Sequence, residues 1–318
     1  MTEGSRPGVP RRTVVAGLFG VVLPTAGCGI RLEDDAPRIP LVPTRTPVPA
    51  EAELVALTRG TAALAALAAT VPGPLAGDLA TLHQRQHTVL RSTLLAEGVP
   101  AADLDATASP SPTTSTSTSA PPAAAPAGRA ALAALAAAEG ASAAGAGGFA
   151  GVEADLFATI ASLHAQRYAA ASLLSGRPPA VPSDPVGGDR VGTLATSTAG
   201  ALYLLEVVSA RSSGGQRARS DTSLAALRAL LADQQAGGAT ADESLGHPLP
   251  FPVGDAAAAA RLARQSLTAL RAGYGDHLGP IVASDGGPGL AALTRWLGAV
   301  EVEAHRWGVA LEPFPGLT

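Results

Sequence analysis

Alanine and leucine supply most of the apolar residues of this 318-residue chain, and they recur at three- and four-residue steps. Such steps place side chains along one face of a helix. Alanine also has the highest helix propensity of the amino acids. Strand-like runs, in which apolar residues such as Val, Ile or Tyr alternate with polar ones, do not occur. The sequence therefore predicts an all-α fold.

Prolines and glycines divide the helix-forming segments into two groups. We expect a first helical domain of about four helices over residues 51–180 and a second domain of four helices over 185–318. A Ser-, Thr- and Pro-rich insertion at about residues 100–128 offers little apolar area to bury, which predicts disorder. The expected helices cover about residues 51–71, 75–97, 129–139, 149–175, 191–211, 217–235, 255–278 and 289–311.

The first 27 residues have the three parts of a secretory signal peptide. A positively charged segment ends in Arg11 and Arg12, a short apolar run follows, and small residues come last. The apolar run is too short to cross a bilayer, which takes about 20 residues. The Arg11-Arg12 pair resembles a twin-arginine export signal. It is followed by Thr13-Val14-Val15 instead of the usual Phe-Leu, so the general secretory and twin-arginine routes both stay open.

Cys28 is the only cysteine of the chain, so it cannot form an intramolecular disulfide. The residues before it, Thr25, Ala26 and Gly27, resemble a bacterial lipobox. The resemblance implies that the Cys28 thiol receives a diacylglyceryl group and that the chain is cut just before it. The mature protein would then be lipid-anchored at the extracytoplasmic face of the cell membrane. The alternative is a buried structural cysteine.

Residues 28–50 contain five prolines, at positions 37, 40, 43, 47 and 49. Proline at this density favours an extended polyproline conformation. We therefore expect this segment to be a tether that holds the folded part away from the membrane.

The formal net charge of the chain is −4, and no basic stripe runs along it. We therefore expect no nucleic-acid partner.

The C-terminal part carries several short motifs: Phe251-Pro252-Val253 before Asp255, Tyr274, Trp307, and the ending Phe314-Pro315-Gly316. Together they resemble the end of a ferritin-like domain of unknown function found in actinobacterial lipoproteins. The resemblance covers residues 189–318. It implies an antiparallel, ferritin-like four-helix bundle with no assigned activity. From the residues themselves, Asp255 is a good N-cap for the helix that follows it.

Ferritin-like di-iron sites need glutamates from two helices and a Glu-x-x-His motif from each of the other two. No glutamate of this chain has a histidine three residues later, so we expect no di-iron centre and no bound cofactor. Two weaker metal-binding hypotheses remain, His83 with His87 and Glu206 with Glu301 and His305. The first would need a third ligand such as Glu153 or His164. In the alternative without a metal, Glu206 contacts an arginine or water, and Glu301 forms an exposed pair with His305.

No motif of a known catalytic site is found in the sequence. We therefore expect a non-catalytic envelope protein that binds an unknown protein or ligand or has a structural role. The alternative is a metal- or cofactor-binding protein that uses one of the two residue sets above. A hydrolase whose site leaves no motif is the least favoured class.

We also expect His164 to be a half-buried packing residue and Trp296 and Trp307 to anchor the core.

Overall fold

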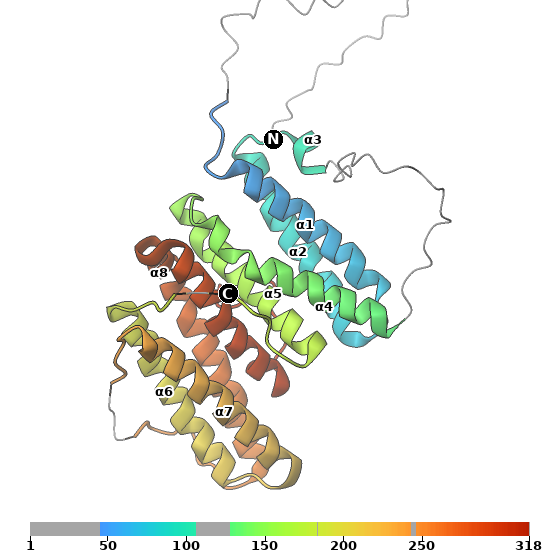
Figure 1. Ribbon diagram of the computed structural model, residues 1–318. Helices are drawn as coiled ribbons and strands as arrows, with labels where there is room; N and C mark the ends of the chain where they lie inside the picture. Colours follow the sequence, from blue (N-terminus) through green and yellow to red (C-terminus); the bar gives the residue numbers. More distant parts are fainter. Residues whose placement is uncertain (1–44, 106–127, 183, 243–245, 318) are drawn as a thin grey trace, which may run out of the picture. The chain divides into compact units, whose positions relative to one another are not determined.

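The computed structural model describes residues 45–105, 128–182, 184–242 and 246–317. All regular secondary structure in these ranges is helical, which confirms the all-α prediction (Figure 1). The described residues belong to one compact unit that begins at Arg45. The predicted signal peptide, Cys28 and most of the insertion lie outside the described residues.

Eight α-helices and two short 3₁₀ turns are found in the part of the chain that the structure describes. They are α1 (Glu51–Thr70), α2 (Pro74–Ala96), α3 (Ala101–Asp105), α4 (Arg129–Ala144), η1 (Ala146–Phe149), η2 (Ala154–Leu156), α5 (Phe157–Ser175), α6 (Asp189–Ala210), α7 (Gly214–Ala236) and α8 (Ala256–Arg306). Most boundaries lie close to those predicted from sequence.

Several predictions at the edges of helices were wrong. Residues 101–105, assigned to the disordered insertion, form α3, because Leu104 is buried and Arg91 pairs with Asp105 at 2.8 Å. The long helix expected from residue 149 begins only at Phe157. The glycine-rich stretch before it, which includes Gly151, forms the two 3₁₀ turns instead, since glycine weakens a regular helix.

Helix α8 joins two helices that the sequence predicts as separate. Only Gly286, with φ 57° and ψ −131°, departs from helical geometry inside it. This left-handed φ favours glycine. We call residues 256–285 the N-arm and residues 287–306 the C-arm. Arg271 of the N-arm pairs with Glu301 of the C-arm at 2.9 Å, so the two arms run antiparallel.

Both ends of α8 are capped. Asp255 accepts a hydrogen bond from the backbone N–H of Ala258 at 2.7 Å, which confirms the predicted N-cap. At the other end Trp307 follows the last helical residue, and Gly308 has a φ of 84°. The N–H of Val309 donates to the carbonyl of Ala304, which is the Schellman arrangement. The helix predicted to reach residue 311 therefore ends at Arg306.

Helix α5 lies at the centre of the described structure, between α4 and α8 (Figure 1). Every residue from Ile160 to Ser172 is buried, as expected for a helix with packing partners on all sides. Gly298 of the C-arm permits close contact, because a Cβ there would lie 2.6 Å from Tyr168 Cδ1 and 2.9 Å from the Ala165 carbonyl oxygen. The two helical domains predicted over residues 51–180 and 185–318 therefore share one core, which contains side chains such as Leu163 and Leu293.

Helices α1 and α6 are long and apolar enough to cross a membrane, judged by length and composition alone. In the structure α1 packs against α2, and α6 packs against α7 and α8. The core helix of a soluble protein passes the same composition test, so these two helices carry no argument for a membrane span.

Candidate functional site

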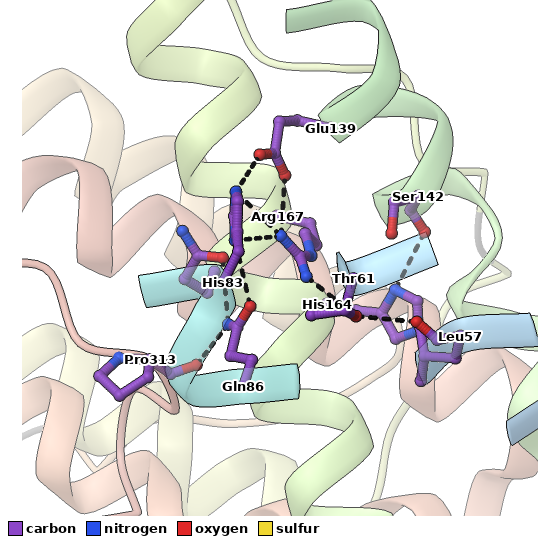
Figure 2. A network of polar contacts seen from close by, with 10 residues as sticks. Leu57, Thr61, His83, Gln86, Glu139, Ser142, His164, Arg167 and Pro313 are labelled. Atoms are coloured by element: carbon purple, nitrogen blue, oxygen red, sulfur yellow. Dashed lines mark hydrogen bonds and ion pairs between the residues drawn. The ribbon is translucent and has the colours of Figure 1, made fainter. Parts of the chain in front are cut away.

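A buried polar network joins four helices of the N-terminal part (Figure 2). Helix α2 supplies His83, α4 supplies Glu139, α5 supplies Arg167 and α1 supplies Thr61. His83 Nε2 lies 2.5 Å from one Glu139 oxygen, and Arg167 Nη1 lies 3.5 Å from the other. Arg167 Nη2 donates to Thr61 Oγ1 at 3.2 Å. All four residues are at most 1% exposed, so this network is closed to solvent.

The network extends through Gln86 to the C-terminal tail (Figure 2). Gln86 Oε1 lies 3.2 Å from His83 Nδ1, and Gln86 Nε2 donates to the Pro313 carbonyl at 2.5 Å. Two residues further along the tail, the Pro315 carbonyl accepts from Ser162 Oγ of α5 at 2.7 Å. The tail thereby ties α2 to α5 with hydrogen bonds that need no particular tail side chain.

Arg167 and Glu139 balance each other's charge in the interior between α1, α2, α4 and α5. A buried ion costs several kcal/mol of desolvation unless an opposite charge and hydrogen bonds compensate it. Burial lowers the pKa of Arg167, while Glu139 acts to raise it. The guanidinium also contacts the ring of His83. His83 and Glu139 therefore contact each other directly, and the Arg167 guanidinium lies beside both of them, where it opposes the approach of a second cation.

His164 lies one turn of α5 away from this network and is kept neutral. Its Nδ1 donates to the Ser142 carbonyl at 2.9 Å, and its Nε2 makes no hydrogen bond to any other described residue. Burial, reinforced by the charge of Arg167, lowers the pKa of His164 to about 3. The sequence predicted a half-buried packing residue. The imidazole is instead only 1% exposed, and its ring centroid lies 5.1 Å from that of Phe149.

The two predicted metal sets are not brought together. His83 belongs to the buried network, whereas His87 is half-buried and takes no part in it. Glu206 was considered for the bundle interior, but it is exposed and pairs with Arg228 at 3.0 Å. Among the described residues, no group of three or more His, Cys, Asp and Glu side chains is placed to hold a metal ion.

Glu301 was expected either at a metal or in an exposed pair with His305, and both hypotheses were wrong about its surroundings. It is 1% exposed and pairs with Arg271, while its second oxygen accepts the backbone N–H of Glu312 at 2.9 Å. Burial raises the pKa of Glu301, and Arg271 opposes this shift. Arg271 also contacts the Glu312 carboxylate, so an arginine again forms the cationic centre.

The largely apolar interior between α6, α7 and the N-arm contains a small set of uncharged polar side chains. Gln234 Nε2 donates to the Tyr274 hydroxyl at 2.6 Å, and Thr198 Oγ1 lies 3.5 Å from the same oxygen. Tyr274 is fully buried, and burial raises its pKa. No carboxylate takes part in this set of hydrogen bonds, so it offers no ligand with the charge that a di-iron centre requires.

Sequence analysis missed the residues that matter most here, Arg167, Glu139 and Arg271. A signal for Arg167 does exist, since it stands in the Ala-rich stretch of α5 that offers apolar or small residues on every face. Arginine in such a stretch must be buried and therefore paired. Its partner Glu139 is on another helix, so the pairing itself depends on the tertiary structure.

No protein-family model matches this chain, and neither a curated protein nor a solved structure matches it significantly.

Proposed function

We propose that this chain is an exported envelope protein, anchored by acyl chains on Cys28 at the extracytoplasmic face of the membrane. The support is the succession of a charged segment with Arg11 and Arg12, a short apolar run, and Thr25-Ala26-Gly27-Cys28. The first described residue is Arg45, and a proline-rich stretch lies between it and Cys28. Two or three acyl chains make anchoring stable where a single chain is marginal.

We further propose that residues 189–318 form a ferritin-like scaffold and that the chain has a binding or structural role in place of di-iron chemistry. The observation that carries this proposal is that each buried glutamate of the described residues pairs with an arginine, namely Glu139 with Arg167, Glu301 with Arg271 and Glu303 with Arg306. Ferritin-like centres place carboxylate and imidazole ligands from four helices around metal ions. A fixed internal cation neutralises each of these buried carboxylates and repels a second cation. The scaffold is then held together by its own ion pairs.

Anchoring is tested by a Cys28→Ala variant of the full chain expressed in a bacterium that processes lipoproteins. We expect the wild-type chain in the membrane fraction and labelled by a radioactive fatty acid. The variant should carry no label and should either leave the membrane fraction or keep its first 27 residues. A Thr44→Ala variant, changed beyond the cleavage point, serves as the control and should behave as wild type. Membrane association and processing that persist unchanged in Cys28→Ala would contradict the proposal.

A further inference from the structure

We infer that a cleft between α5, α7 and the C-arm binds a small amphipathic anion, a molecule with one carboxylate on an apolar body. The cleft has a volume of about 410 Å³. Pockets of roughly 300 Å³ or more can enclose most of a small ligand. This inference goes beyond the proposed scaffold role and does not depend on the lipid anchor.

The walls of the cleft are apolar because α7 and the C-arm present small side chains there. Ala226 and Ala229 come from α7, and Ala299 comes from the C-arm. Trp296 also lines the cleft, and it is held in place because its Nε1 donates to Asp233 Oδ2 at 2.6 Å. The small side chains supply the apolar surface of the cleft, and the Trp296 ring, only 2% exposed, supports it from behind.

The charged groups of the cleft leave one positive charge uncompensated. Arg295 pairs with Asp233 at 2.7 Å, and Arg306 pairs with Glu303 at 2.6 Å. Each carboxylate that lines the cleft thus already has an arginine partner. Arg177, just beyond the end of α5, also lines the cleft and makes no ion pair with any other described residue. An arginine guanidinium in this position matches the geometry of a carboxylate.

Tyr168 adds a neutral hydrogen-bond donor to the same cleft. Its side chain is only 9% exposed, and its hydroxyl forms no hydrogen bond with another described residue. Burial raises the pKa of Tyr168, and both Arg295 and Asp233 act on it electrostatically, which places the phenol near that ion pair. A phenol that stays protonated donates to an anionic oxygen. The available guanidinium and the phenol both favour an anion over a cation or a neutral molecule.

The test uses three probes that share one ring system: 1-naphthoate, 1-naphthalenemethanol and 1-naphthylmethylammonium. Each is titrated into the full chain by isothermal titration calorimetry. We expect naphthoate to bind about tenfold more tightly than the alcohol or the ammonium, since a charge-assisted hydrogen bond contributes that much to affinity. Equal affinity for all three probes, or no binding of any, would overturn the inference.

Variants assign the binding to this cleft. Arg177→Ala should weaken naphthoate binding about tenfold and leave the alcohol unchanged, because Arg177 is exposed and carries no ion pair to lose. Ala229→Trp places a large ring at an exposed position of the cleft and should abolish binding of every probe. Arg264→Ala, at an exposed arginine outside the cleft, is the matched control. Naphthoate affinity that is unchanged in both Arg177→Ala and Ala229→Trp would show that the probe binds elsewhere and would refute the inference.

Discussion

Acidification should destabilise the fold through His164. This imidazole has a pKa of about 3 in the folded protein, because it is buried and lies near Arg167. In the unfolded chain the pKa of histidine is about 6.5. The unfolded state therefore binds a proton first as the pH falls. This destabilising effect is absent above pH 6.5. The free energy of unfolding then falls progressively as the pH is lowered from 6.5 to 3.

The size of the effect follows from the gap between the two pKa values. A pH of 5 is about 1.5 units below the pKa of the histidine in the unfolded chain, which is therefore protonated, while the folded imidazole is still neutral. At about 1.36 kcal/mol per unit, the free energy of unfolding should fall by about 2 kcal/mol between pH 7.5 and pH 5. The loss belongs to this one side chain, so a variant without a titrating group should not show it.

Urea denaturation followed by circular dichroism at pH 7.5, 6 and 5 measures this contribution. His164→Asn keeps a donor for the Ser142 carbonyl but does not titrate, and His164→Phe removes both properties. Each variant loses some stability at pH 7.5 through altered packing. From pH 7.5 to 5, however, each should lose about 2 kcal/mol less than the wild type. A wild type and variants whose stability falls in parallel would refute the assignment of a buried neutral imidazole.

Two further predictions concern packing and charge in the core. Arg167→Met leaves Glu139 buried without its cation and should lower the free energy of unfolding by about 3–5 kcal/mol. Arg228→Ala, which breaks only the exposed pair with Glu206, should cost less than about 1 kcal/mol in the same urea assay, and equal losses would argue against a buried charge network. Gly298→Ala forces a Cβ against α5 and should lower stability by about 1–3 kcal/mol. Gly273→Ala, in the same helix with free space around it, should raise stability by up to about 1 kcal/mol in thermal unfolding, and the opposite order would contradict the close contact of α5 with the C-arm.

The helices themselves could be predicted because their signals are local. The periodic leucines of α1 and the N-cap at Asp255 depend on neighbours within a few residues along the chain. The join at Gly286 was missed because glycine is equally common in loops and in sharp reversals. The sequence does not show that a single glycine suffices for the chain to turn back there.

The candidate site was less predictable because the side-chain partners come from distant segments. Glu206 and Glu301 both stand in apolar stretches, yet the first faces solvent and the second is buried against Arg271. A helix can bury more than one face when it has several neighbours, and only the tertiary structure decides which. The same holds for Arg167, whose partners Glu139 and His83 come from two other helices.

The central claim is that arginine, and not a metal ion, compensates the buried carboxylate in the interior between α1, α2, α4 and α5. Elemental analysis of the soluble protein beginning at Gly29 tests this claim most directly. The account predicts much less than one metal ion per chain and a thermal unfolding midpoint that a chelator does not change. The double variant His83→Ala, His87→Ala provides the comparison, because it removes both candidate imidazole ligands. Stoichiometric metal in the wild type that is lost from this variant would contradict the account.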